Sequence, residues 1–365
     1  MHEYIIIGGG LIGMLTAREL AMAGRQVTLL EQDRVGRESS WAGGGIISPL
    51  YPWRYDPSIT ALASWGQHYY PELMAALYKE SGIDPEYTRN GLLIVEPEDN
   101  EQALTWGKAT QQSLSNLEKT AIGDCEPALT TTANKAIWMP EVAQVRNPRL
   151  VKATYGSIEK RLEIRENCRV SKLLARDGRI QGLETDSGNI AAKQVIVCAG
   201  AWTGDLLKGL VIRPSIEPVL GQMILFHSKP NAISRIVLHQ DRYVIPRRDG
   251  RVLVGSTLEH RGFDKTTTQA AKEALKDYAL AHFPLLREAK IEHHWAGLRP
   301  GSPSGIPYIG PVPGIQGLYL NAGHFRNGVV LGPASARLMS DIVLDREPIL
   351  PSTPYALDAH RDQVS

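Results

Sequence analysis

Three glycines and one glutamate near the start of the chain have the types and spacing of a dinucleotide site. Gly8, Gly10 and Gly13 form the pattern G-x-G-x-x-G within IIIGGGLIG, and Glu31 follows them at roughly the 20-residue distance of the fingerprint. The glycines allow a tight turn, a close approach of the pyrophosphate and close helix packing, while Glu31 can accept hydrogen bonds from an adenosine ribose. This pattern does not separate FAD from NAD, and a glycine-rich structural turn is the alternative.

A second group of polar residues lies in the last third of the chain. Arg299 is part of HHWAGLRPGSPSGIPYIGP, and a guanidinium can bind a carboxylate through two parallel hydrogen bonds. Tyr243 could add a phenolic hydrogen bond to the same carboxylate. His324 and Arg326 come just before the last expected helix, whose N-terminus could stabilise an anionic reduced flavin ring. The alternatives are a surface arginine, a core tyrosine and plain helix capping.

The residues 33–53, DRVGRESSWAGGGIISPLYPW, are rich in Gly and Ser and follow the ribose-binding acid directly. Ser39 and Ser40 could donate hydrogen bonds to phosphate. Gly44 and Gly45 would let the backbone approach a flat ligand closely. The alternative is a flexible surface loop.

These residues need a βαβ unit to position them. Tyr4 to Ile7 and Val27 to Leu30 are short apolar runs that predict buried strands, and Leu11 to Ala23 has helical spacing. A further buried strand is predicted at Val195 to Cys198, and small residues including Gly200 follow it. Such a strand end is typical of a second nucleotide-facing edge, although close strand-to-helix packing gives the same pattern.

The rest of the chain alternates between helical and extended patterns. We expect helices over 58–81, 98–119, from 146, over 267–283 and over 329–344, and extended segments over 86–96, 136–140, around the turn Asp177-Gly178, within 216–258 and over 318–321.

This order predicts an α/β plus α+β fold, in which a doubly wound Rossmann-like domain is interleaved with an antiparallel-sheet domain. The dinucleotide-binding domain is assigned to residues 1–82, 146–212 and 296–365. The substrate-binding domain is assigned to residues 83–145 and 213–295.

Composition narrows the functional class. The chain has 365 residues, of which 43% are hydrophobic, and a net charge of +1, so it can bury a large core and is not expected to bind nucleic acid. Its three cysteines, Cys125, Cys168 and Cys198, are widely spaced. They indicate neither a metal cluster nor a disulfide framework, and they favour a reduced cytoplasm. No apolar run is long enough to predict a membrane span.

Several motifs together resemble the family of FAD-dependent amine and D-amino acid oxidases, across essentially the whole chain. The resemblance is carried by IIIGGGLIG with Glu31, RESSWAGGGIISP, VIVCAGAW, YVIPR followed by VGST, WAGLRPGSPSGIPYIGP and GHFRNG. WAGLRP together with GHFRNG is specific at the level of the subfamily, whereas the first motif is not.

The resemblance implies FAD rather than NAD. It implies that the flavin is held non-covalently, because no cysteine follows Cys198 in the sequence. In addition to Gly8, Gly10 and Gly13, cofactor contacts are expected at Leu11, Ile12, Glu31, Gln32, Ser39, Ser40, Gly44, Gly45, Ile46, Val170, Gly200 and the segment His324, Phe325, Arg326, Asn327, Gly328, Val329 and Val330.

The resemblance also implies a substrate and a reaction. Arg299 would bind the carboxylate of a small amine or D-amino acid, with Tyr243 assisting and Arg326 nearby, and a hydride would pass to flavin N5. Dioxygen would reoxidise the flavin and give hydrogen peroxide, and the product would serve thiazole synthesis. A homotetramer without a membrane partner is expected. Leu258 departs from the methionine of the family pattern, and we expect it to alter the shape of the pocket.

The alternatives are a D-amino acid dehydrogenase that reduces a quinone, a non-catalytic flavin-binding subunit, and an NAD-dependent dehydrogenase. The dehydrogenase of D-amino acids would react poorly with oxygen. The non-catalytic subunit would hold flavin that no amine reduces, and the NAD enzyme would be colourless.

Overall fold

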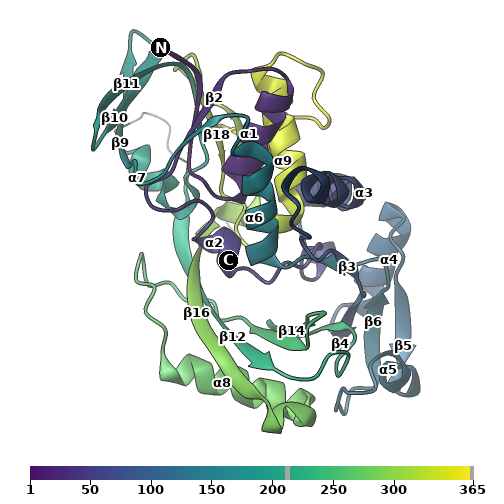
Figure 1. Cartoon of the computed structure of the whole chain (residues 1–365). Helices are drawn as coiled ribbons and strands as arrows, with labels where there is room; N and C mark the ends of the chain where they lie inside the picture. Colours follow the sequence, from purple (N-terminus) through teal and green to yellow (C-terminus); the bar gives the residue numbers. More distant parts are fainter. Residues whose placement is uncertain (210–213, 362–365) are drawn as a thin grey trace.

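The computed structural model describes residues 1–209 and 214–361. Two eight-stranded sheets form the framework. In Figure 1 one sheet lies beside the helices α1 (Leu11–Met22), α3 (Pro57–Ser81), α6 (Asn147–Ile158) and α9 (Gly328–Val343), and the other lies below it with α8 (Gln269–His282) on its outer side. The predicted fold class is confirmed: a Rossmann-like α/β part and a second, mostly antiparallel part are interleaved along the chain.

The first sheet is parallel through its centre. Its order is β17-β18-β11-β1-β2-β8, and β17 is antiparallel to β18. Strands β9 and β10 continue from β11 as an antiparallel extension. The bounds are β1 His2–Ile7, β2 Val27–Leu30, β8 Glu163–Arg165, β9 Val170–Arg176, β10 Arg179–Thr185, β11 Gly188–Val197, β17 Tyr308–Pro311 and β18 Leu318–Ala322.

The alternation of side chains along β1 explains why both faces of this sheet are covered. Tyr4 and Ile6 pack into a core shared with the helices, whereas Ile5 and Ile7 pack into a second core shared with β9 and β10. A strand that is buried on both faces has a continuous apolar run instead of an alternating one, as the sequence from Tyr4 to Ile7 has. The helices on the first face are α1 Leu11–Met22, α3 Pro57–Ser81, α6 Asn147–Ile158 and α9 Gly328–Val343.

A buried tyrosine fixes the start of α9. Pro333 lies inside this helix and has no N–H, so the carbonyl of Val329 lacks its partner four residues along. The hydroxyl of Tyr70 on α3 donates a hydrogen bond of 2.6 Å to that carbonyl. The first turn of α9, which lines the cavity described below, is therefore held by a residue on another helix.

We expect Tyr70→Phe to lower the free energy of unfolding by about 1–3 kcal/mol, because it leaves a buried carbonyl unpaired. Urea denaturation of the holoprotein measures this change. Tyr78→Phe on the same helix is the matched control, since Tyr78 is 56% exposed. Equal stabilities of the two variants would contradict the role given to the Tyr70 hydroxyl.

The second sheet joins two separate parts of the chain. Its order is β16-β12-β15-β14-β13-β4-β6-β5. Within the described residues, β13 and β4 form its one parallel pair, and this pair is where the two parts meet. The bounds are β4 Leu92–Val95, β5 Ser115–Glu118, β6 Lys135–Met139, β12 Glu217–His227, β13 Ile236–His239, β14 Arg242–Pro246, β15 Arg251–Gly255 and β16 Lys290–Gly301.

Short elements complete the fold. They are α2 Ser39–Ala42, α4 Asn100–Thr110, α5 Lys119–Cys125, α7 Thr203–Leu206 and the two-stranded pair β3 Thr88–Arg89 with β7 Ala143–Gln144, together with five 3-10 turns at Pro52–Arg54, Gly200–Trp202, Pro284–Glu288, Pro303–Gly305 and Thr353–Tyr355.

The sequence prediction is wrong in one region. A single helix was expected over 98–119, but α4 ends at Thr110 and a strand, β5, follows. Gln111 caps α4 with a φ of 56°, and β5 then pairs with β6, so long-range pairing overrides the local helical pattern.

The bounds of the two interleaved domains stay a prediction. The expected boundary at 295/296 falls inside β16, which pairs with β12 in one register from His293 to Gly301. The expected boundary at 212/213 and the end of the chain at 365 lie outside the described residues.

Candidate active site

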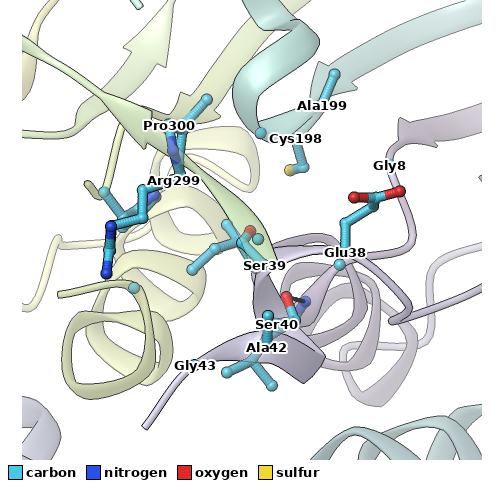
Figure 2. A pocket seen from close by; sticks show the side chains of 18 of the residues that line it. Gly8, Glu38, Ser39, Ser40, Ala42, Gly43, Cys198, Ala199, Arg299 and Pro300 are labelled. Atoms are coloured by element: carbon cyan, nitrogen blue, oxygen red, sulfur yellow. Dashed lines mark hydrogen bonds between the residues drawn. The ribbon is translucent and has the colours of Figure 1, made fainter. Parts of the chain in front are cut away.

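A long cavity runs between the two sheets and is lined by both. Figure 2 shows Arg299 on one side of it and Gly8 and Glu38 on the opposite side. Glu31, Val170, Tyr243 and Arg326 also line it. Figure 2 shows Arg299, Ser39, Ser40 and Cys198 around this cavity, although they come from separate parts of the chain.

The glycine turn packs as tightly as the sequence pattern requires. A Cβ on Gly13 would lie 1.9 Å from the carbonyl oxygen of Gly8, and a Cβ on Gly8, whose φ is +109°, would lie 2.3 Å from the carbonyl oxygen of Cys198. Helix α1 can therefore begin directly against the end of β1. Its first turn has no acidic residue, so no side chain of that turn opposes the binding of a phosphate by the partial positive charge of the helix N-terminus.

Two polar side chains prepare this turn for a dinucleotide. Ser40 suits a phosphate and Glu31 suits a ribose. The backbone N–H of Leu11 donates to Ser40 Oγ at 2.8 Å, which leaves the hydroxyl proton of Ser40 available to a phosphate oxygen. Glu31 accepts hydrogen bonds from the N–H of Gly9 at 2.7 Å and of Asp33 at 3.0 Å. Burial raises the pKa of Glu31, and its two oxygens are fixed at the cavity edge, where a ribose can donate to them.

The glycine loop after α2 is held by a buried arginine that the sequence analysis did not single out. Arg247 donates to the carbonyl of Gly44 at 2.7 Å, to that of Val145 at 2.9 Å and to Gln144 Oε1 at 2.6 Å. Burial lowers the pKa of Arg247 to about 10. A Cβ on Gly45 would lie 2.1 Å from the carbonyl oxygen of Val145. The loop is thus a fixed, close-packed wall and not a flexible surface segment.

Arg299 lies on the side of the cavity opposite to Gly8, with its charge unpaired. Its guanidinium donates to the carbonyls of Leu220 and Thr257, each at 3.3 Å, and to Ser256 Oγ at 2.7 Å. No carboxylate of the described residues forms an ion pair with it, and burial lowers its pKa, with the nearby charge of Arg326 acting in the same direction. Arg299 is half-buried, and covering a cation that has no countercharge is costly, so this site favours an anionic ligand.

Gly221 on β12 makes room for this guanidinium. A Cβ on Gly221 would lie 2.3 Å from both terminal nitrogens of Arg299 and 2.4 Å from its Cζ. The sequence contains a usable signal here, because a glycine inside the apolar run PVLGQMILF marks a close approach in a strand.

The turn between β18 and α9 is hydrogen-bonded to β16 next to Arg299. The N–H of Phe325 donates to the carbonyl of Pro300 at 3.0 Å, which places Arg326 close to Arg299. His324 is buried in this turn, and its Nε2 lies 2.9 Å from Ser335 Oγ. Burial lowers the pKa of His324 to about 3, so its ring is neutral near pH 7.

The neutral ring of His324 makes stability depend on pH. Unfolding frees the ring to take up a proton below its ordinary pKa of about 6.5, so this contribution to stability is present above that pH and is lost as the pH falls toward 3. We expect the loss of this contribution to lower the free energy of unfolding by about 2 kcal/mol when the pH falls from 7 to 5. His324→Gln should remove this part of the decline.

Urea denaturation of the holoprotein at the two pH values measures the difference. His68→Gln is the control, because His68 is exposed. If His324→Gln loses as much stability on acidification as the control, the buried ring does not carry the effect.

The structure brings nearly all of the predicted site residues to this cavity. Arg299, Tyr243 and Arg326 line it, as do the predicted cofactor residues Gly8, Gly10, Leu11, Ile12, Glu31, Gln32, Ser39, Ser40, Gly44, Gly45, Ile46, Val170, Gly200, His324, Phe325, Gly328, Val329 and Val330. The exceptions are Gly13, which packs against Gly8, and Asn327, which is buried.

One expectation about the pocket is wrong. Leu258 was expected to shape the pocket, but its side chain is 47% exposed and does not line the cavity. Other lining residues, among them Gly221, Met223 and Trp202, were not predicted, because they come from segments whose pairing the sequence does not reveal.

A comparison with known families decides the classification. The model of the family described as FAD dependent oxidoreductase (DAO) matches residues 3–342. The chain belongs to this family of FAD-dependent oxidoreductases. The predicted resemblance and the predicted cofactor, FAD, are both confirmed.

This FAD-dependent oxidoreductase is similar to named relatives over nearly all of its length. It is 49% identical over 356 residues to a glycine oxidase of Pseudomonas putida, covering 97% of this chain and 98% of that one. It is 29% identical to the bifunctional protein ThiO/ThiG of Trichormus variabilis, covering 97% of this chain and 55% of that protein. Its structure is similar to the crystal structure of glycine oxidase from Geobacillus kaustophilus, with a TM-score of 0.94, 26% identity, and coverage of 98% and 99%.

The residues of the cavity fit FAD. The N-terminus of α1 and Ser40 suit the pyrophosphate, Glu31 suits the ribose, and the Gly43–Gly45 backbone leaves space that a Cβ on Gly44 would fill close to Tyr243.

Within the described part of this oxidoreductase, no helix has both the length and the apolar composition needed to cross a bilayer.

Proposed function

We propose that this protein is a glycine oxidase, which oxidises glycine and other small amines or D-amino acids. The balanced reaction is glycine + O₂ + H₂O → glyoxylate + NH₃ + H₂O₂. The 49% identity to a glycine oxidase supports this proposal. The observation that carries it is the half-buried guanidinium of Arg299 on the wall of the FAD cavity, which pairs with no carboxylate of the described residues.

The residues around Arg299 would bind and orient the substrate. Arg299 binds its carboxylate, and the hydroxyl of Tyr243, which lines the same cavity and lies 4.0 Å from Met223 Sδ, donates a second hydrogen bond. Arg326 adds positive charge close to Arg299. Holding the carboxylate at a fixed place orients the carbon that bears the amine, and such positioning supplies much of the catalytic effect.

Bound FAD supplies the oxidising chemistry, in which a hydride leaves the substrate carbon and dioxygen finally takes up the electrons. The amine must be neutral to release a hydride. His324 is a candidate for the base that takes a proton from the amine. Burial lowers its pKa to about 3, and its ring is hydrogen-bonded to Ser335, so it is a poor proton acceptor near pH 7 and we assign it no role as a general base.

The proposal also covers how the flavin is bound, which pathway uses the product, the compartment and the oligomeric state. The flavin is held non-covalently, the product serves thiamine thiazole synthesis, and the protein works in the cytoplasm as a homotetramer. The similarity to proteins that join ThiO to ThiG supports the link to this synthesis. The three cysteines, which are free, suit a reducing compartment.

Oxygen consumption by the purified yellow protein tests the proposal. Glycine, sarcosine, D-alanine and D-proline are supplied in parallel, and peroxide is measured. We expect oxygen uptake with glycine and an equal amount of peroxide. If no amine consumes oxygen but a dye restores turnover, the protein is a dehydrogenase. Flavin that no amine reduces without air would indicate a non-catalytic binding protein.

A further inference from the structure

A buried amide lies directly behind the guanidinium site. Successive side chains of a strand point to opposite faces of the sheet, and on β12 Gly221 and Met223 line the cavity. Gln222 between them therefore points to the opposite face. It is fully buried, and a buried amide must have hydrogen-bond partners to be tolerated.

The side chain of Gln222 and its backbone N–H bond to residues on the face of the sheet opposite to the cavity. Its Nε2 donates to Glu259 Oε1 at 2.8 Å and to Thr268 Oγ1 at 3.3 Å. Its Oε1 accepts from the N–H of Thr268 at 2.9 Å and lies 3.1 Å from His294 Nε2. Its backbone N–H donates to Thr257 Oγ1 at 2.9 Å.

These bonds fix both ends of the segment between β15 and α8. Thr257 and Glu259 lie at its start and Thr268 lies at its end, and Thr257 Oγ1 donates to Glu259 Oε1 at 2.6 Å. Burial opposes the charge of Glu259, but the hydrogen bonds from Thr257 and Gln222 outweigh it and lower the pKa of this carboxyl. The network therefore contains a fixed carboxylate as well as the neutral amide.

The same segment supplies the groups that hold Arg299. Ser256 Oγ and the carbonyl of Thr257 accept from the guanidinium. The carbonyl of Leu220 also accepts from it, and Leu220 is paired with Glu259 through two backbone hydrogen bonds of 2.9 and 3.0 Å. Each acceptor of Arg299 is thus joined to the segment that Gln222 anchors.

We propose that Gln222 is a positioning residue for substrate binding, which holds Ser256 and Thr257 so that Arg299 presents its guanidinium to the substrate carboxylate. This inference rests on the proposed function of Arg299. Because no carboxylate of the described residues pairs with Arg299, its printed hydrogen bonds all go to neutral acceptors, which set its direction.

The middle of the segment is held at the cavity as well. Phe263 stacks on Trp202 with ring centroids 5.6 Å apart, and Lys265 Nζ lies 2.8 Å from Glu38 Oε1. Trp202 and Glu38 line the cavity. If the ends of the segment moved, the residues that line the cavity would therefore move as well, and not only the residues on the opposite face of the sheet.

Two variants test the proposal, Gln222→Met and Thr257→Val, each of which removes polar atoms and keeps the approximate shape. We expect the KM for glycine and the Kd for acetate to rise about tenfold, with kcat within about twofold of the wild type. Acetate binding is followed by the change in flavin absorbance and needs no turnover. Thr154→Val on α6 is the control, because Thr154 is buried and bonds only within its helix.

A double-mutant cycle separates positioning from general stability. In an Arg299→Ala background, Gln222→Met should have no further effect on acetate binding, because nothing is left to position. Unchanged KM and Kd in folded single variants would overturn the proposal. So would a parallel loss of FAD affinity, kcat and KM, which would indicate a purely structural role. If the wild type neither oxidises glycine nor binds acetate, the proposed function itself is wrong, and this result is distinct from a failure of the proposal for Gln222.

Discussion

Arg299→Ala is expected to raise the KM for glycine about 100- to 1000-fold while FAD stays bound. Removing one partner of a buried charge pair costs about 3–5 kcal/mol, and each 1.4 kcal/mol corresponds to about tenfold in binding. The half-buried Arg299 side chain lines the cavity, where a bound substrate would cover it, and the described residues offer it no carboxylate. The substrate carboxylate would therefore be its sole strong partner in this part of the protein, and the loss should be close to the full value.

Steady-state oxygen uptake gives the KM, and the absorbance of bound flavin gives the FAD content. Arg299→Lys keeps the charge but not the planar pair of donors, so we expect an intermediate KM. Arg176→Ala is the control, since the side chain of Arg176 is 83% exposed. A KM for Arg299→Ala that equals that of the control would remove Arg299 from the carboxylate site.

Gly221→Ala is expected to raise the KM for glycine on the order of 10- to 100-fold without unfolding the protein. The new methyl group would lie 2.3 Å from two atoms of the Arg299 guanidinium. The end of a long side chain can move more cheaply than backbone can, so the sheet should persist and the guanidinium should shift. A displacement of about 1 Å is enough for a loss of this size.

Gly123→Ala provides the matched control for this substitution. Gly123 lies within α5, and a Cβ there would meet nothing within 4 Å. Alanine should stabilise that helix slightly, by about 0.5–1 kcal/mol. Thermal unfolding and flavin content establish that both variants are folded. Wild-type KM values in Gly221→Ala would mean that the guanidinium has more freedom than its packing indicates.

Much of the cofactor site could be predicted because its chemistry is local in sequence. The turn at Gly8, the helix that follows it and the acid at the end of β2 lie within one βαβ unit, so spacing alone places them together. The structure agrees closely, with α1 at Leu11–Met22 and β2 at Val27–Leu30. Local hydrogen bonding and steric limits fix such a unit without help from the rest of the chain.

The substrate end could be predicted only through the resemblance. Taken alone, Arg299 and Tyr243 had ordinary alternatives, since an arginine near glycines is as common on a surface as in a site. Gly221 and Arg247 were missed because their partners lie far away: Gly221 packs on Arg299, and Arg247 bonds to the carbonyl of Gly44. No periodicity in the sequence reveals such pairs.

The sequence by itself thus determined the class of fold, the dinucleotide turn and the family of the protein. Each depends on residues that are close along the chain or on whole motifs. The tertiary structure decided where the charge of Arg299 is held. That required the register of β12 against β16, in which Val219 pairs with Arg299 and Gly221 with Gly297, and the return of the 256–268 segment to Gln222. Strand register and buried hydrogen bonds are properties of the packed chain, because they depend on which distant segments exclude water together.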